Sequence, residues 1–172
     1  MTGATIEIRD ERAGDEAVIR AVNDAAFGQP DESRMVDAIR AARHEAISLV
    51  AVSDHTIVGH ILFTPVTIDG AASPVRAAGL APMAVLPPHQ RHGIGSRLVH
   101  AGLSRCRDRG YSAVVVLGHP AFYPRFGFDR ASAFGLTCEF EVPDDAFMVA
   151  ELSPGSLSGV TGVVKYLAEF GA

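Results

Sequence analysis

The stretch Gln90-Arg91-His92-Gly93-Ile94-Gly95-Ser96 decides the fold of this chain. It lies between an apolar run, residues 79–86, and an amphipathic run that ends near Arg109, so we expect a strand, a loop and a helix in that order. Gly93 and Gly95 let the backbone approach a ligand without a Cβ atom in the way, and the first N–H groups of a helix have no intrahelical acceptor. The pattern therefore predicts an anion-binding helix N-terminus.

Two common phosphate-binding loops do not match this stretch. A nucleoside triphosphate loop needs a Lys and a Ser or Thr directly after its last Gly, and the only lysine of the chain is Lys165. A dinucleotide loop needs a third Gly where Leu98 stands, with the first Gly in a tight turn just after a strand, whereas two prolines and a polar run intervene here. The sequence therefore disfavours both triphosphate hydrolysis and dinucleotide binding.

The pattern Gln-x-x-Gly-x-Gly, following a strand that contains Pro82, resembles the coenzyme A pyrophosphate loop of the GNAT superfamily of N-acetyltransferases. Residues 80–99 (LAPMAVLPPHQRHGIGSRLV) are similar to the fourth strand, loop and third helix of that family. Residues 111–128 (YSAVVVLGHPAFYPRFGF) are similar to its fifth strand and tyrosine-bearing turn. The closest likeness is to a bacterial subgroup of acetyltransferases with the same Arg-Phe-Gly-Phe run.

The resemblance implies both a fold and a reaction. The fold is a single α/β domain, residues 1–172, whose mixed sheet is flanked by helices and whose two parallel central strands splay to admit the cofactor. The reaction is transfer of the acetyl group of acetyl-CoA to a primary amine by direct attack. The implied site uses the backbone of Met83, Ala84 and Val85 along the pantetheine arm and acetyl carbonyl, and for the pyrophosphate it uses Gln90, Arg91, His92, Gly93, Ile94, Gly95 and Ser96.

Tyr123 is the side chain that the resemblance assigns to catalysis, because it stands four residues before Gly127 as in the family's Tyr-x-x-x-Gly-Phe pattern. A phenol with a pKa of about 10 is protonated at neutral pH and can pass a proton to the departing thiolate. Pro124 disfavours helical geometry at Tyr123, which would fix the aim of the hydroxyl. The competing interpretation is a core tyrosine. Two departures from the family favour it: Gly-His-Pro precedes the turn where many members have Asn, and Phe122 replaces a second tyrosine.

The sequence does not identify a general base. Four residues are candidates, and each also fits a structural or solvated role: His60, His119, Asp31 and Glu32. His89 and His92 lack a nearby carboxylate or thiol, so no metal site is predicted. Cys106 and Cys138 lie in apolar surroundings without metal-type spacing, which predicts free thiols and disfavours a covalent cysteine route.

Composition limits the remaining possibilities. With 172 residues, 48% of them hydrophobic, the chain is long enough for one well-buried core. The formal net charge of −5 disfavours nucleic acid and anionic membranes as partners, although positive charge gathers locally at Arg91, Arg97, Arg105, Arg107 and Arg109. The charged N-terminal segment and the lack of a long apolar run predict a cytoplasmic protein. The oligomeric state is not predicted.

The acetyl acceptor stays open at this stage. The loops at residues 28–34 and 71–76 and the C-terminal strands are the segments expected to choose it. A small amine, an amino acid, an antibiotic, or an amine of a protein or tRNA all fit. A function of another class also fits, namely a noncatalytic acyl-CoA binding module that senses or scaffolds.

Periodicity predicts the other elements. Helices are expected over residues 17–27, 32–43 and 94–109, and strands over residues 5–9, 47–53, 57–64, 80–86, 114–117, 136–142, 146–152 and 160–166. The strands on either side of the third helix should be parallel, because a helical crossover joins them. Pro82 lacks the N–H of a ladder hydrogen bond, so it predicts an edge strand or a bulge.

Overall fold

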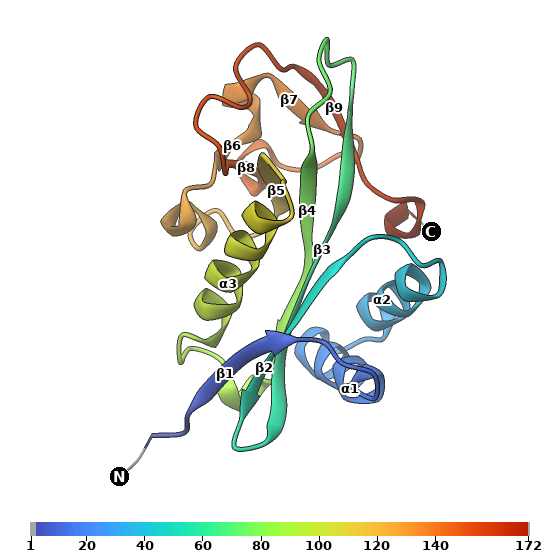
Figure 1. The fold of residues 1–172 in the computed structure, drawn as a ribbon, viewed down its shortest axis with the longest axis vertical. Helices are drawn as coiled ribbons and strands as arrows, with labels where there is room; N and C mark the ends of the chain where they lie inside the picture. Colours follow the sequence, from blue (N-terminus) through green and yellow to red (C-terminus); the bar gives the residue numbers. More distant parts are fainter. Residues whose placement is uncertain (1–2, 172) are drawn as a thin grey trace. The chain divides into compact units, whose positions relative to one another are not determined.

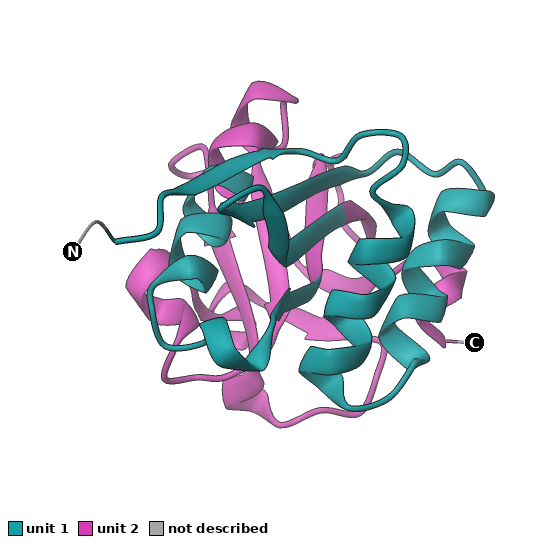
Figure 2. Cartoon of the chain, turned by 90° about the horizontal axis from the view of Figure 1, so that it is seen from below, with its two compact units in different colours: residues 1–63, 82–102 teal, residues 64–81, 103–172 magenta. Residues whose placement is uncertain are grey.

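The chain divides into two compact units in the computed structural model, which describes residues 3–171 (Figure 2). Unit 1 consists of residues 1–63 and 82–102, and unit 2 of residues 64–81 and 103–172. Three elements contribute residues to both units: strands β3 (Thr56–Asp69) and β4 (Ala77–Val85) and helix α3 (Ile94–Asp108). The single domain expected from the sequence stays a prediction.

Three antiparallel strands form the sheet of unit 1. β1 (Ile6–Asp10) pairs with β2 (Ile47–Ser53), and β2 pairs with β3. The hairpin turn between β2 and β3 consists of Asp54 and His55, which have φ angles of 47° and 67°. Positive φ at both central residues is what a two-residue hairpin turn prefers, so local chemistry fixes the register here.

Two amphipathic helices connect β1 to β2. α1 (Glu16–Phe27) ends at Gly28, whose φ of 71° suits the residue after a helix, and α2 (Asp31–Ala41) begins after a short loop. Each helix buries one stripe, as helical spacing of its apolar residues predicts. The buried residues of the two helices are Ile19, Val22, Asn23, Ser33, Val36 and Ile39.

The sheet of unit 2 is built on a parallel pair. β4 and β5 (Ala113–Leu117) are in register from Ala77↔Ala113 to Leu80↔Val116, as expected for strands joined by a helical crossover. β8 (Phe147–Glu151) pairs antiparallel with β5. The alternate residues on one face of these strands join a core cluster that includes Ala77, Ala113, Val115, Phe147 and Val149.

Short strands complete unit 2. β6 (Asp129–Arg130) pairs antiparallel with β8, and β9 (Gly162–Lys165) pairs antiparallel with the end of β3 and parallel with β7 (Leu136–Cys138). The hydrogen-bonded strand order is β1-β2-β3-β4-β5-β8-β6, with β9 pairing with both β3 and β7 (Figure 1). The pairs β4–β5 and β7–β9 are parallel, whereas β1–β2, β2–β3, β3–β9, β5–β8 and β6–β8 are antiparallel, so the mixed α/β fold class predicted from the sequence is confirmed.

Helix α3 follows the predicted pattern from its first residue to its last. Its buried side chains recur at helical spacing, and Gly110 just beyond it has a φ of 82°. The N–H of Gly110 donates to the Arg107 carbonyl and the N–H of Tyr111 to the Cys106 carbonyl, each at 3.0 Å, which is a Schellman end. The residues buried along α3 are Ile94, Leu98, Val99, Leu103 and Cys106.

Two expectations about strands are corrected by the structure, and one further strand, β6, was not expected. Pro82 does not mark an edge, because β4 lies between β3 and β5 in the strand order. The register of β4 with β5 ends at Leu80, before the proline, and the alternative of a bulge stays a prediction. The strand expected over residues 136–142 ends at Cys138, because the Glu139 carboxylate accepts the Tyr166 N–H and the chain turns away towards Pro143. β6 is two exposed residues long, too short for a periodic signal.

Candidate functional site

The loop between β4 and α3 has an unusual backbone. Arg91 has a φ of 63° and Gly93 a φ of 80°, so two left-handed residues flank His92. Alternation of this kind turns successive N–H groups towards one side and forms an anion-binding nest. A Cβ atom built on Gly93 would meet no atom within 4 Å, so a ligand has room to approach the backbone there.

The first turn of α3 supplies further donors. The Arg97 N–H donates to the Gly93 carbonyl at 3.1 Å, so the N–H groups of Gly95 and Ser96 precede the first hydrogen bond of the helix. The Ile94 side chain, 3% exposed, anchors this turn in the core. Helices α1 and α2 begin with acidic residues, whereas the first turn of α3 has none. The positive end of α3 is therefore left for an external anion.

Gln90 ties the loop to the strand before it. Its side-chain Nε2 donates to the Val85 carbonyl at 2.9 Å, and the 3-10 turn Pro87–His89 between them is closed by a 2.8 Å bond from the His89 N–H to the Leu86 carbonyl. The amide that opens the motif therefore holds the shape of the loop, and the Gln90 backbone N–H also stays within it, donating to the Pro87 carbonyl at 3.3 Å. Sequence reasoning missed this bond, because it depends on how the two prolines fold the chain back.

The arginines of the local cluster lie at opposite ends of helix α3. Arg105 and Arg107 belong to the last turn of α3, where positive charge complements the helix dipole. At about 1.5 Å per residue, that turn lies roughly 16 Å from the first residue of α3, beyond a screening length of about 8 Å at physiological salt. Arg91 and Arg97, both exposed, are the members of the cluster that lie beside the loop.

The strand segment expected to line the pantetheine arm is largely buried. Ala84 and Val85 are 2% and 9% exposed, while Met83 is half-buried. The chain leaves β4 through Leu86, whose N–H donates to the Val58 carbonyl of β3 at 2.8 Å. All ten residues that the resemblance assigns to the cofactor therefore lie in unit 1, on one continuous segment of strand, loop and helix.

Tyr123 lies in unit 2, at the first residue of the 3-10 helix Tyr123–Phe126. Its ring packs edge-to-face against Phe122 and Phe128, with centroid separations of 5.0 and 5.6 Å. A Cβ atom on Gly118, directly after β5, would collide with the Tyr123 ring, so this glycine is required by close approach. The expectation that Pro124 keeps Tyr123 out of helical geometry is wrong, because proline is accepted in the first turn of a helix.

Burial changes the acidity of Tyr123. The residue is 7% exposed, and loss of solvation raises the pKa of its phenol to about 12. The hydroxyl is therefore protonated throughout the neutral range and is a weaker acid than a solvated phenol. A neutral hydroxyl of this kind can donate a hydrogen bond to developing negative charge before it transfers a proton.

His60 is excluded from contact with a substrate by burial. It is 0% exposed, and its pKa is lowered to about 3, chiefly by loss of solvation and secondly by the nearby Arg40 charge. The Asn23 side-chain nitrogen, which also donates to the Ile19 carbonyl at 3.0 Å, lies 3.2 Å from His60 Nδ1. His60 Nδ1 therefore accepts, and Nε2–H donates to Ser48 Oγ at 2.9 Å. This tautomer makes His60 a structural residue and leaves Ser48 without an activating base.

The other candidate bases are at the surface. His119 and Asp31 are exposed, and Glu32 accepts hydrogen bonds from Gln29 in the first turn of α2. Both cysteines are free; burial raises the pKa of Cys106 to about 12, which suits a packed thiol and not a nucleophile. Within residues 3–171, no group of three or more His, Cys, Asp or Glu side chains is arranged to hold a metal ion.

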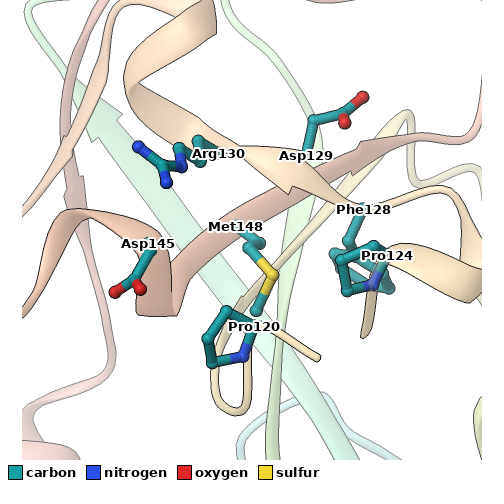
Figure 3. A pocket seen from close by; sticks show the side chains of 7 residues that line it. All are labelled: Pro120, Pro124, Phe128, Asp129, Arg130, Asp145 and Met148. Atoms are coloured by element: carbon teal, nitrogen blue, oxygen red, sulfur yellow. The ribbon is translucent and has the colours of Figure 1, made fainter. Parts of the chain in front are cut away.

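A pocket of about 260 Å³ opens beside the Tyr123 turn in unit 2 (Figure 3). Pro120 and Pro124, on either side of Tyr123 in the sequence, form part of its wall. Sequence reasoning missed this pocket, because its members come from two stretches of the chain, residues 120–130 and 145–148, which pair only in the folded protein. Its apolar and charged lining residues are Pro120, Pro124, Phe128, Met148, Asp129, Arg130 and Asp145.

Comparison with known proteins gives the family. A profile of the acetyltransferase (GNAT) domain matches residues 7–131. The chain belongs to the GNAT family of acetyltransferases. The family resemblance predicted from the loop and the tyrosine turn is thereby confirmed.

Two GNAT relatives in Escherichia coli K12 are similar along most of the chain. The uncharacterised N-acetyltransferase YhbS is 34% identical over 166 residues, which cover 96% of each chain. The uncharacterised N-acetyltransferase YjhQ is 37% identical over 145 residues, covering 82% of this chain and 78% of YjhQ.

Solved GNAT structures match the fold as well. The crystal structure of YhbS in complex with CoA has a TM-score of 0.94 and 34% identity, covering 100% of this chain and 95% of YhbS. A GNAT acetyltransferase from Brucella melitensis in complex with acetyl-CoA has a TM-score of 0.79 and 36% identity, covering 96% of this chain and 98% of its own. The GNAT fold predicted from the sequence is therefore confirmed.

Proposed function

We propose that this GNAT protein transfers the acetyl group of acetyl-CoA to a primary amine by direct attack. The amine nitrogen forms a bond to the acetyl carbon, the carbon–sulfur bond breaks, and the amine loses one proton. The observation that carries the proposal is the backbone at Gly93, whose left-handed φ and open Cβ position leave room for a pyrophosphate at an uncompensated helix N-terminus. Two relatives that were crystallised with CoA or acetyl-CoA support it.

The residues of the loop fit the cofactor that the family uses. A pyrophosphate carries negative charge and acceptor oxygens, and residues 91–96 offer N–H donors from a nest and from the first turn of α3. Gln90 holds the loop against Val85, so the donors are preorganised. Acetyl-CoA supplies the activated acetyl group, and no metal is needed for this chemistry.

Tyr123 is the proposed acid. Its protonated hydroxyl would donate a hydrogen bond to the sulfur as the carbon–sulfur bond lengthens, and then the proton as the bond breaks. The proton lost by the amine restores the phenol, so the exchange balances. The residue that first accepts the amine proton is left unassigned.

A noncatalytic acyl-CoA module is the alternative from another class. It would keep the loop and bind the cofactor equally well, but it would release no thiol in the presence of amines.

We place the protein in the cytoplasm as part of the same proposal. Among residues 3–171 no helix is long and apolar enough to cross a membrane. The identity of the acceptor is not part of the proposal.

Gly93→Val tests the loop assignment. The valine side chain would occupy the open space above the backbone and strain the left-handed φ, so calorimetric titration should show loss of CoA binding. Gly155→Val is the matched control, because Gly155 has a φ of 78° and an equally open Cβ position outside the loop. Equal CoA affinity in the two variants would show that the pyrophosphate binds elsewhere.

A further inference from the structure

Two hydroxyl groups of unit 2 are buried without a hydrogen-bond partner. They are Tyr166 Oη and Thr64 Oγ1, which belong to a small set of such side-chain atoms within residues 3–171. Nearly all buried polar groups in native proteins are satisfied, because an unpaired one costs the desolvation of that group. An exception of this kind calls for a function, such as a ligand that completes the bond.

Both hydroxyls belong to one face of the sheet. A Cβ atom built on Gly79 of β4 would lie 2.8 Å from Cε1 of Tyr166 and 3.0 Å from Cγ1 of Val66, so the tyrosine ring rests on the bare backbone at Gly79 beside Val66. Thr64 precedes Val66 by two residues in β3, so alternation along the strand directs their side chains to the same face. The two unpaired hydroxyls therefore belong to the face on which the Tyr166 ring lies against Gly79.

Ring packing and a backbone hydrogen bond fix the position of Tyr166, and its hydroxyl takes no part in either. The backbone N–H donates to Glu139 Oε2 at 2.7 Å, and the ring packs on Phe140 and Phe170 with centroids 5.8 and 5.4 Å away. Burial raises the pKa of Tyr166, so the hydroxyl stays neutral and keeps lone pairs that can accept a hydrogen bond. Packing thus presents a fixed and unsatisfied oxygen.

Tyr166 and Tyr123 serve opposite faces of the β4–β5 pair. Gly79 of β4 is in register with Val115 of β5. Gly118 follows Val115 by three residues and lies against the Tyr123 ring. The Gly118 N–H continues the ladder with β8 by donating to the Ala146 carbonyl at 2.9 Å, so alternation puts Val115 and Gly118 on opposite faces. If Tyr123 donates a proton to the departing sulfur, Tyr166 lies on the opposite face of the strand pair and does not take part in that transfer. Tyr166 is then available to the other reactant, the acceptor amine.

We propose that Tyr166 Oη and Thr64 Oγ1 form the subsite for the acceptor amine, each accepting one N–H of a primary amine. The assignment rests on the proposed acetyl transfer. An amine attacks through its lone pair, so its two N–H bonds must be held elsewhere, and two hydroxyl oxygens do this while leaving the lone pair free. A secondary amine has one N–H and loses half of this binding. The subsite therefore selects primary amines.

The test compares Tyr166→Phe and Thr64→Val with the wild type. An amine is first chosen by thiol release from acetyl-CoA with a panel of amino acids, polyamines and aminosugars. For that amine each variant should lower kcat/KM by about 10- to 100-fold, as expected for one lost hydrogen bond in a dry site, with an unchanged Kd for CoA. The Tm should stay the same or rise, because an unpaired buried hydroxyl has been removed. Phe140→Leu is the control that loosens the ring and keeps the hydroxyl.

Selectivity separates this role from a structural one. The wild type should prefer the primary amine to its N-methyl derivative, and Thr64→Val should reduce that preference, whereas a packing defect would lower both rates together. Wild-type rates and preference in both hydroxyl variants would overturn the subsite. A wild type that releases no thiol with any amine of the panel would instead contradict the proposed function, and the subsite with it.

Discussion

Tyr123 is held by its ring and not by its hydroxyl. Phe122 and Phe128 contact the ring edge-to-face, and Gly118 lies beneath it where any Cβ atom would collide. These contacts position the ring without using the oxygen. Removing the oxygen alone should therefore leave the packing of the turn intact.

Tyr123→Phe makes that change. Turnover should fall by about 10²–10⁴-fold, the usual range for general acid catalysis, while the Kd for CoA stays the same. Thiol release and calorimetry measure the two quantities. Tyr111→Phe removes the hydroxyl of another buried tyrosine in unit 2 and should change neither. Undiminished turnover in Tyr123→Phe would mean that Tyr123 is a core residue and that positioning accounts for catalysis.

Helix α3 uses its two ends differently. Its first turn lacks acidic residues and adjoins the nest at residues 91–93, whereas its last turn carries Arg105 and Arg107 and ends in a glycine cap. The dipole is thus compensated by the chain at one end and left open at the other. An anion bound at the open end would compensate the dipole there.

Ser96→Asp tests the open end. An aspartate in the first turn stabilises a helix by about 0.3–1 kcal/mol but repels a bound pyrophosphate, so the Kd for CoA should rise at least about tenfold. Ser104→Asp adds the same charge at an exposed position further along α3 and should change the Kd little. Added salt should weaken binding in the wild type as well, because Arg91 and Arg97 attract the anion through solvent. Equal affinity in both aspartate variants would exclude a role for the helix end.

Elements with strong local signals were predictable from the sequence. The apolar spacing of α3, the cap at Gly110 and the β-branched run of β5 are local, and the structure has all three. β6 and β7 are only two and three residues long, and their pairing is set by partners distant in the sequence. Two or three residues are too few to show the alternation of polar and apolar side chains that identifies a strand.

His60 links the stability of the folded protein to pH. Its folded pKa of about 3 lies below the ordinary value of 6.5, so the unfolded chain binds more protons between these limits. Its contribution to stability is therefore complete above pH 6.5 and is lost as pH falls towards 3. The main reason for the low pKa of His60 is loss of solvation of the buried ring, and the nearby Arg40 charge adds to it.

Urea unfolding between pH 6.5 and 4.5 checks this linkage. The free energy of unfolding of the wild type should fall as pH falls, by up to about 1.4 kcal/mol per pH unit from this one group. His60→Gln should be less stable at pH 7 and should show a flatter profile. The window stays above the ordinary pKa of 3.8 for Asp15, whose folded pKa is lowered by its hydrogen bond from Arg9, so that pair does not contribute. An equal slope in the variant would contradict a buried neutral His60.

The candidate site was predictable in part. The Gly-x-Gly motif indicated the loop, because glycine adopts the left-handed backbone conformation that Gly93 has more readily than other residues do. Arg91 adopts the same region without being glycine, and the Gln90 side chain turns inward to Val85; neither is encoded locally. Tyr166 and Thr64 could not be predicted from the sequence, because an unpaired buried hydroxyl results from packing between distant segments.

Acetyl transfer by this protein can be measured directly. Purified protein is mixed with acetyl-CoA and a panel of primary amines, free thiol is measured over time, and the acetylated amine is weighed by mass spectrometry. An acetyltransferase should release thiol only in the presence of an amine, with one acetylated amine formed per thiol. CoA binding without amine-dependent thiol release by any member of the panel would contradict it and favour a noncatalytic module.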